Sequence, residues 1–278
     1  MAQSLQLHSF GPNEWSKMTF PESPREIYTQ NPLVEVICQL KFAPILKIET
    51  EPPAAFQELL RKEYPLMQEA VVGQILFPPE VMKAFRDTVP ALMQGRAYHF
   101  ASSDEVWKIA LTRDFIALSA THYTRWEEFR SRLEVILKAL VDVYAPAFFV
   151  RVGLRYRDVI RKSMEGLQGL NWADLLQPHI LGELGAPNIA NAVQHTAREV
   201  VISLDNGLGQ VRVLHGLIRQ AGDTDFSYSI DSDFFSEGRT ELNDVFRVLD
   251  LFNREAGRLF RWCTTPLLHR RLGASELP

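Results

Sequence analysis

Two segments decide the fold: Val34-Glu35-Val36-Ile37-Cys38-Gln39-Leu40-Lys41 and Val150-Arg151-Val152-Gly153-Leu154-Arg155-Tyr156-Arg157. In both, apolar and polar side chains alternate with a period of two residues, which is the pattern of a strand with one buried face. The segments align apolar with apolar and polar with polar, except at Ile37 and Gly153. We therefore predict strands at 33–42 and 148–160 that hold the same place in two halves of the chain.

The same order of elements follows each segment. Turn residues separate the predicted strands, and apolar residues that recur every three or four positions mark the helices. After the first segment and a short helix beyond Pro53, we predict four strands and a long helix at 72–77, 97–101, 106–111, 115–120 and 124–144. After the second segment we predict an interrupted helix, three strands and a long helix at 171–184, 197–204, 211–218, 226–234 and 242–263. Thr124 and Glu127 predict a capping box at the start of the first long helix.

The repeated order predicts an α+β fold of internally duplicated antiparallel sheet units, each gripping one long helix, as a saddle or a helix-grip-like arrangement. We place an irregular, proline-containing N-terminal arm at 1–32, a first α+β repeat at 33–146 and a second at 147–278. The alternative is that the two strands align by chance, since all half-buried strands alternate.

Composition excludes several classes of protein. The 278 residues are 46% apolar and 23% charged, which is typical of a globular chain and not of a disordered one. The longest apolar stretch, Val143 to Val150, is far shorter than the ~18 residues of a membrane-spanning helix. Thirty basic and 34 acidic residues give a net charge of −4, which makes a nucleic-acid partner an unfavoured hypothesis. Cys38 and Cys263 cannot form a disulfide framework, and the N-terminus has no signal-like pattern, so we expect a cytoplasmic protein.

Three motifs resemble a known family. Asn31-Pro32-Leu33-Val34-Glu35-Val36, Trp126-Glu127-Glu128-Phe129 and Gly153-Leu154-Arg155-Tyr156 resemble a sporadically distributed prokaryotic family of uncharacterised proteins of about this length. The resemblance extends over nearly the whole chain, and its most specific part is the last motif. At Arg157-Asp158 the family pattern would have an apolar residue and asparagine. The resemblance implies no reaction, but its patchy distribution implies a mobile or defence-type locus.

The polar face of the second segment is the strongest candidate binding site. Arg151, Arg155 and Arg157, which we call the arginine row, point to one side of the strand because side chains alternate. Gly153 leaves room between them for a ligand. Glu35, Gln39 and Lys41 of the first segment would lie opposite the row if the two halves meet there. The alternative is a structural seam, in which Glu35 pairs with an arginine and no ligand binds.

A second candidate is a divalent-cation site. Asp231 and Asp233 share one side of a predicted strand, and Glu237 follows. Because no defined ligand spacing accompanies them, a solvated strand edge is the favoured interpretation. Cys38 and Cys263 fall on apolar faces, and the histidines match no metal-binding motif, so we predict no cofactor and no catalytic residue.

We therefore expect a non-enzymatic binding protein that docks a protein partner or a second copy of itself, with the arginine row as the contact. The alternative is a metal-assisted enzyme acting on a phosphorylated or nucleotide substrate. In that case the arginines would hold phosphate, and the two aspartates would hold the metal ion.

Overall fold

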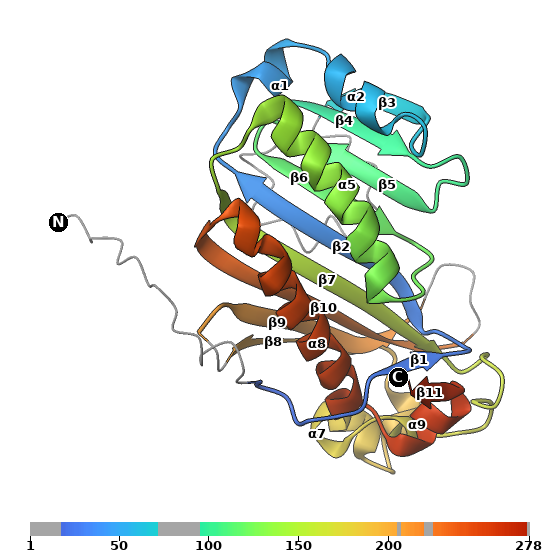
Figure 1. Cartoon of the computed structure of the whole chain (residues 1–278). Coiled ribbons are helices and arrows are strands. Elements are labelled where there is room, and N and C mark those ends of the chain that lie inside the picture. Colours follow the sequence, from blue (N-terminus) through green and yellow to red (C-terminus); the bar gives the residue numbers. More distant parts are fainter. Residues whose placement is uncertain (1–17, 72–94, 205–206, 220–224, 277–278) are drawn as a thin grey trace.

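Nine strands form one sheet in the part of the chain that the structure describes. This computed structural model describes residues 18–71, 95–204, 207–219 and 225–276. The strands are β2 (Leu33–Phe42), β3 (Leu66–Val71), β4 (Arg96–Ala101), β5 (Trp107–Leu111), β6 (Phe115–Ala120), β7 (Phe149–Arg161), β8 (Arg198–Ser203), β9 (Gln210–Ile218) and β10 (Ser227–Thr240). Their order in the sheet is β3-β4-β5-β6-β2-β7-β10-β9-β8, and every neighbouring pair is antiparallel (Figure 1).

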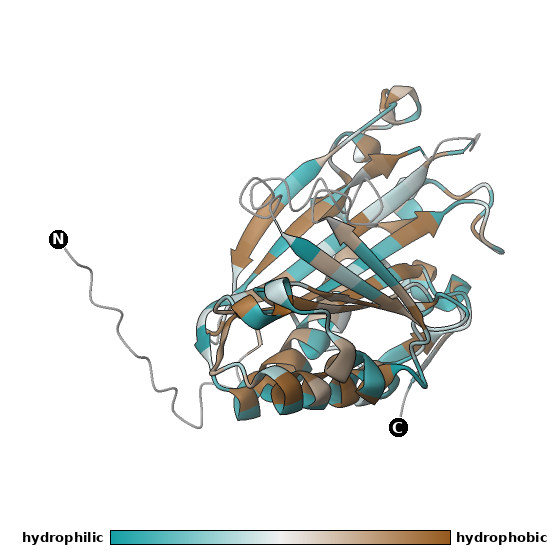
Figure 2. Cartoon of the chain, turned by 90° about the horizontal axis from the view of Figure 1, so that it is seen from above, coloured by the Kyte–Doolittle hydropathy of each residue, from teal (hydrophilic) through white to brown (hydrophobic). Residues whose placement is uncertain are grey.

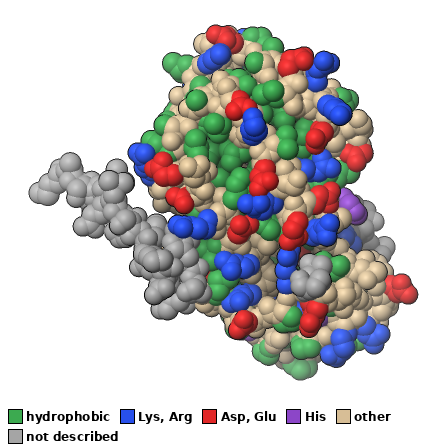
Figure 3. Space-filling model, viewed as in Figure 1, with side chains coloured by type: hydrophobic (Ala, Val, Ile, Leu, Met, Phe, Trp, Pro, Cys, Tyr) green, Lys and Arg blue, Asp and Glu red, His purple; other side chains and the backbone are tan. Residues whose placement is uncertain are grey.

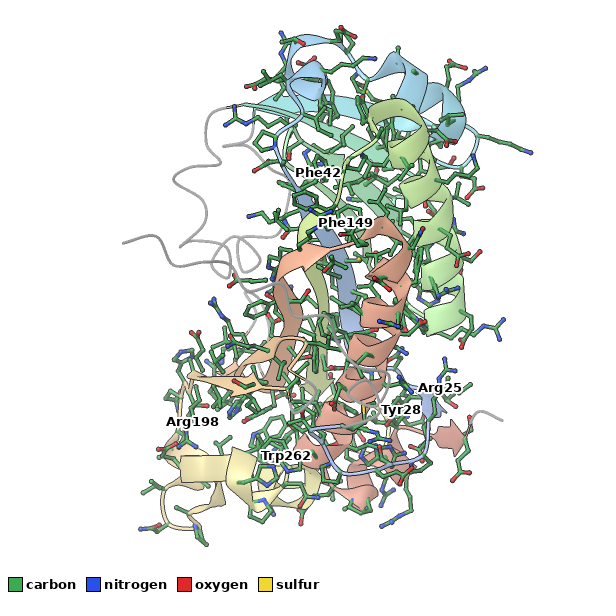
Figure 4. All side chains as sticks on the ribbon, turned by 60° about the vertical axis from the view of Figure 1, so that its left-hand side comes forward. Arg25, Tyr28, Phe42, Phe149, Arg198 and Trp262 are labelled. Carbon is green, nitrogen blue, oxygen red and sulfur yellow. The ribbon has the colours of Figure 1, made fainter. Side chains whose placement is uncertain are left out.

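The two segments that decide the fold are neighbours at the centre of this sheet. In their register Val36 lies opposite Tyr156 and Leu40 opposite Val152. These side chains belong to the main hydrophobic core. Phe42 and Phe149 close the far end of the pair with ring centroids 6.5 Å apart, and Figure 4 shows their labelled side chains close together. The two segments therefore pair along the centre of the sheet, which places Glu35, Gln39 and Lys41 beside the arginine row.

Two helices of 19 residues each, α5 (Trp126–Tyr144) and α8 (Val245–Cys263), lie side by side on one face of the sheet (Figures 1 and 2). Their apolar stripes contribute fully buried side chains such as Phe129 and Phe252 to the core. The indole nitrogen of Trp126 donates to Asp250 Oδ1 at 2.7 Å, which joins the two helices. An α+β architecture with an antiparallel sheet is thus confirmed.

The two halves contribute their elements in matching order. Counting outward from the centre, one half supplies β2, β6, β5 and β4, and the other supplies β7, β10, β9 and β8. A long helix, α5 or α8, follows the last strand of each half. The strand β3 has no counterpart in the described part of the second half. Duplication of one unit remains a prediction.

Shorter elements differ from our expectations in several places. The structure adds α1 (Leu46–Thr50) and α9 (Pro266–Arg271), and the expected strand at 72–77 lies outside the described residues. The predicted helices near Pro53 and Pro178 are α2 (Ala54–Leu60), α6 (Trp172–Leu175) and α7 (Pro178–Leu181). Short 3-10 turns occupy Gly182–Gly185, Ala190–Ala192 and Leu242–Asp244.

The predicted capping box at Thr124 is wrong. Arg125 is the N-cap residue of α5, and the Thr124 hydroxyl donates to Glu128 instead of accepting from a backbone amide of the first turn. Glu127 is not available to Thr124 because its carboxylate pairs with Arg25 at 2.7 Å. A contact between residues 102 positions apart thus replaces the local one.

The N-terminal segment is attached to α8. Its residues Glu26–Tyr28 form β1, which pairs with β11 (Ala274–Glu276), so the segment predicted to be irregular contains a strand. The backbone amides of Thr19 and Phe20 donate to the Glu255 carboxylate at 2.7 and 3.3 Å. Glu255 is fully buried in α8. Phe20 packs against Trp262, with ring centroids 5.6 Å apart.

Candidate functional site

The arginine row lies on the face of the sheet away from α5 and α8, and each of its members contacts a carboxylate. Arg155 is 5% exposed and donates from Nε to Asp231 Oδ1 at 2.6 Å, with a second bond from Nη2 to Oδ2. Arg151 Nη2 lies 2.9 Å from Asp233 Oδ2, and Arg157 Nη1 lies 3.7 Å from Glu35 Oε2. The structure therefore brings the predicted residues together as an ion-paired seam.

The space that we expected beside Gly153 is occupied by Arg151. A Cβ atom at Gly153 would collide with the Arg151 guanidinium group. That group donates from Nη1 to Gln39 Oε1 at 3.1 Å and lies 5.0 Å from the centre of the Phe235 ring. Gly153 accommodates a neighbour on its own strand, and not a ligand.

The aspartates proposed for metal binding are engaged by the same arginines. Burial raises the pKa of Asp233, and the guanidinium groups of Arg151 and Arg155 oppose this shift. Glu237 lies opposite Arg151 in the register of β10 and β7, and Lys41 lies opposite Arg151 on the other side. Within the described ranges, no group of three His, Cys, Asp or Glu side chains is arranged to hold a metal ion. Cys38 and Cys263 are buried free thiols.

A different site, on the helix face, combines a cavity with unusual chemistry. The cavity has a volume of about 290 Å³ and lies between the N-terminal segment, the start of α5, the end of β7 and the middle of α8. We call it the Asp158 cavity. Its aromatic lining consists of Tyr28, Tyr123, Trp126, Tyr156 and Phe260. Figure 4 shows Arg25 and Tyr28 together on the N-terminal segment. Segments distant in sequence build it, which is why no local motif revealed it.

Asp158 lines this cavity and is only 9% exposed. Burial raises the pKa of its carboxyl group to about 8, and the negative charge of Asp231 adds to the shift. Within the part of the chain that the structure describes, no hydrogen bond or ion pair reaches this carboxyl group. Asp158 was assigned no role from the sequence, and its departure from the asparagine that the resemblance implies is the feature that could have marked it.

Two of the tyrosine hydroxyls around the cavity, those of Tyr28 and Tyr156, donate to protein atoms. Thr264 Oγ1 donates to the carbonyl oxygen of Phe260 at 2.6 Å and lies 3.0 Å from His269 Nε2, so this nitrogen carries the proton. His269 Nδ1 then accepts from the Tyr28 hydroxyl at 2.8 Å. Burial, assisted by Arg261, lowers the pKa of His269 to about 4, so this histidine is neutral at pH 7. Tyr156 donates to Asn253 Oδ1 at 2.9 Å.

Arginine is the main charged residue of the lining. Arg25 pairs with Glu127, Arg261 pairs with Glu26, and Arg258 lies 3.9 Å from the exposed Glu22. Arg125 and Arg254 are exposed, and neither pairs with a carboxylate among the described residues. Figure 3 shows basic and acidic side chains interleaved across this face. The lining of the Asp158 cavity therefore includes two arginines that form no close ion pair within the described ranges, and a buried carboxyl group.

A second cavity, of about 540 Å³, lies against β3, β4, β5 and β6. Its charged lining residues are Glu35, Glu105 and Lys108. Glu35 contacts Arg157, and Lys108 lies 3.5 Å from Glu105. Because these charges are paired, this cavity offers a ligand fewer charged groups for binding than the Asp158 cavity does.

No family model matches the chain, and no curated protein matches it either. The assignment of function therefore depends on the geometry alone. No helix of the described ranges combines the length and apolar character needed to cross a membrane.

Proposed function

We propose that this protein is a non-enzymatic binding protein and that the Asp158 cavity takes up the anionic group of a small organic ligand. The observation that carries the proposal is the pair of exposed arginines, Arg125 and Arg254, which line an aromatic cavity and have no carboxylate within ion-pair distance among the described residues. Arginine binds carboxylate and phosphate groups through paired, charge-assisted hydrogen bonds.

The shape and composition of the cavity agree with this chemistry. Small-molecule sites are concave and mostly apolar, with a few polar groups that set the orientation of the ligand. Five aromatic residues can pack against a planar or apolar body. Arg125 and Arg254 can hold a charge at the solvent side of that body. The cavity suits a compact ligand, since its volume of about 290 Å³ lies just below the usual range of roughly 300–1,000 Å³.

Other hypotheses from the sequence receive less support. The sequence placed the contact with a protein partner or a second copy of the chain on the arginine row, whose guanidinium groups already contact carboxylates. The metal-assisted enzyme would use Asp231 and Asp233, which contact the same row. A cytoplasmic location and a mobile or defence-type locus remain hypotheses. The matching order of the two halves supports duplication of one sheet-and-helix unit.

Titration with benzoate tests the proposal. Benzoate carries one carboxylate on an aromatic body, and an efficient ligand of this size can reach millimolar affinity. We expect saturable chemical-shift changes for residues around the Asp158 cavity, and a dissociation constant about tenfold weaker in Arg254→Gln. Arg61→Gln is the matched control, since Arg61 is an exposed arginine next to α2 that does not line this cavity. Absence of saturable binding at about 10 mM benzoate, or equal weakening by both substitutions, overturns the proposal.

A further inference from the structure

Asp158 is 9% exposed and lines the Asp158 cavity, and its carboxyl group has no hydrogen-bond or ion-pair partner among the described residues. We propose that Asp158 acts as a neutral carboxylic acid that donates a hydrogen bond to the ligand, so that the ligand carries an acceptor oxygen opposite its anionic group. This inference rests on the proposed function and adds a second recognition group to the ligand, the acceptor oxygen.

The first step concerns protonation. An ionised carboxylate that is 9% exposed and receives no hydrogen bond within the described residues is costly, because protein groups do not replace its lost hydration. No arginine of the lining is among the groups that shift the pKa of Asp158. The neutral acid avoids most of the cost. The raised pKa of about 8 agrees with this argument from burial.

The second step concerns the hydrogen. A neutral carboxylic acid has one O–H donor, and a buried donor without an acceptor is unfavourable. Tyr28 and Tyr156 already donate to His269 and Asn253. Asp158 therefore differs from the two hydroxyl groups near it, because its own donor has no acceptor in the described part of the protein. A ligand oxygen that enters the cavity supplies that acceptor.

The third step separates an acceptor from a cation. A ligand ammonium group could also satisfy Asp158, but only after the carboxyl group lost its proton. Arg125 and Arg254, which line the same cavity, would also repel such a ligand. A ligand with an anion at the arginines and a neutral oxygen at Asp158 requires neither the loss of that proton nor the approach of a cation to the arginines. Carbonyl compounds with a carboxylate or phosphate at the other end belong to this class.

The charged and titratable neighbours leave Asp158 as the group that responds near pH 8. Burial raises the pKa values of Tyr28, Tyr123 and Tyr156 well above that range, and it raises the pKa of Cys263 to about 12. Asp231 stays bonded to Arg155. The arginines of the lining remain cationic throughout. The Tyr28 partner His269 titrates near pH 4, far below the range used here.

Two probes of the same shape test the inference. 4-Acetylbenzoate carries a ketone oxygen opposite its carboxylate, and 4-isopropylbenzoate lacks it. In the wild-type protein at pH 6 we expect the ketone to bind about tenfold more tightly, which is the value of one satisfied hydrogen bond. Asp158→Asn, whose amide is always a neutral donor, keeps this preference, and Asp158→Leu loses it. Raising the pH from 6 to 9 removes the preference in the wild-type protein but not in Asp158→Asn.

Each other outcome has a defined meaning. If both probes bind equally and Arg254→Gln weakens both, this inference is wrong while the proposed function stands. If neither probe binds saturably, both fall. If 2-phenylethylamine binds more tightly than either probe and Asp158→Asn abolishes it, Asp158 is a receptor for cations and the inference is overturned. Should Asp158→Leu fail to fold, the pH series on the wild-type protein and Asp158→Asn decides the question.

Discussion

The guanidinium group of Arg151 lies over Gly153, in the space that a side chain at residue 153 would fill. Because of this position, Arg151 reaches Gln39 on one neighbouring strand and Asp233 on the other. Arg155 shows the same diagonal geometry, since its register partner on β10 is Asp233 but it bonds to Asp231. Because residue 153 has no side chain, Arg151 can lie across β7 and join the ion-paired seam over three strands.

Replacing Gly153 with alanine tests this relationship. The new methyl group displaces the Arg151 guanidinium and breaks its bonds to Gln39 and Asp233, so we expect a loss of about 1 kcal/mol in the free energy of unfolding. The arginine is flexible, which keeps the cost modest. In an Arg151→Met background the same change should cost nothing. Urea denaturation of the four proteins gives the coupling energy, and additive effects would contradict the contact.

The ion pair of Arg155 and Asp231 should dominate the stability of the seam. Asp231→Ala leaves the buried guanidinium without its carboxylate, and we expect a loss of about 3 kcal/mol in the free energy of unfolding. The exposed pair of Lys138 and Asp142 provides the control, because Asp142→Ala should cost less than about 0.5 kcal/mol. Equal losses in the two variants, measured by urea denaturation, would show that the seam is not buried as described.

Asp158 should make the protein less stable as the pH rises. Its pKa is about 8 in the folded protein and has an ordinary value of 3.8, so between these values the folded state holds a proton that the unfolded chain has released. Stability therefore falls through this window, by about 1.4 kcal/mol per pH unit at most, and levels off above pH 8. Asp158→Asn removes this contribution. Parallel slopes of unfolding free energy against pH for the two proteins would refute it.

Glu255 should fix the N-terminal segment to α8. Glu255→Met keeps the length of the side chain but cannot accept the amide hydrogens of Thr19 and Phe20. We expect faster tryptic cleavage after the exposed Arg25, because the segment can leave the helix surface. Glu134→Met, on the exposed side of α5, is the control and should leave the cleavage rate unchanged. Mass spectrometry of the early fragments identifies the cleaved bond.

Most of the fold could be predicted because it depends on local patterns. The alternation at 34–41 and 150–157 identified the two central strands, and helical spacing identified both long helices. The prediction was wrong where a residue distant in sequence replaced the expected local partner. Thr124 is the example, because its expected partner Glu127 pairs with Arg25. Residues 26–28 gave no strand signal, since their pairing depends on the C-terminal strand β11.

The candidate site was harder to predict for the same reason. The arginine row could be predicted to share one face, but the sequence could not show that Asp231 and Asp233 lie within reach of it. The Asp158 cavity was missed altogether. Its walls come from four separate parts of the chain, and burial, which gives Asp158 its chemistry, is a property of the folded molecule.

The pairing of β2 with β7 has a consequence for assembly. Each strand would become an edge of at least ten residues if the two halves separated at Pro146, with a full row of unsatisfied backbone groups. Two molecules that opened in this way could exchange halves, because β2 of one molecule could form the same backbone hydrogen bonds with β7 of the other. The pairing of β2 with β7 that joins the two halves of one molecule is therefore also the pairing through which an intertwined dimer would form.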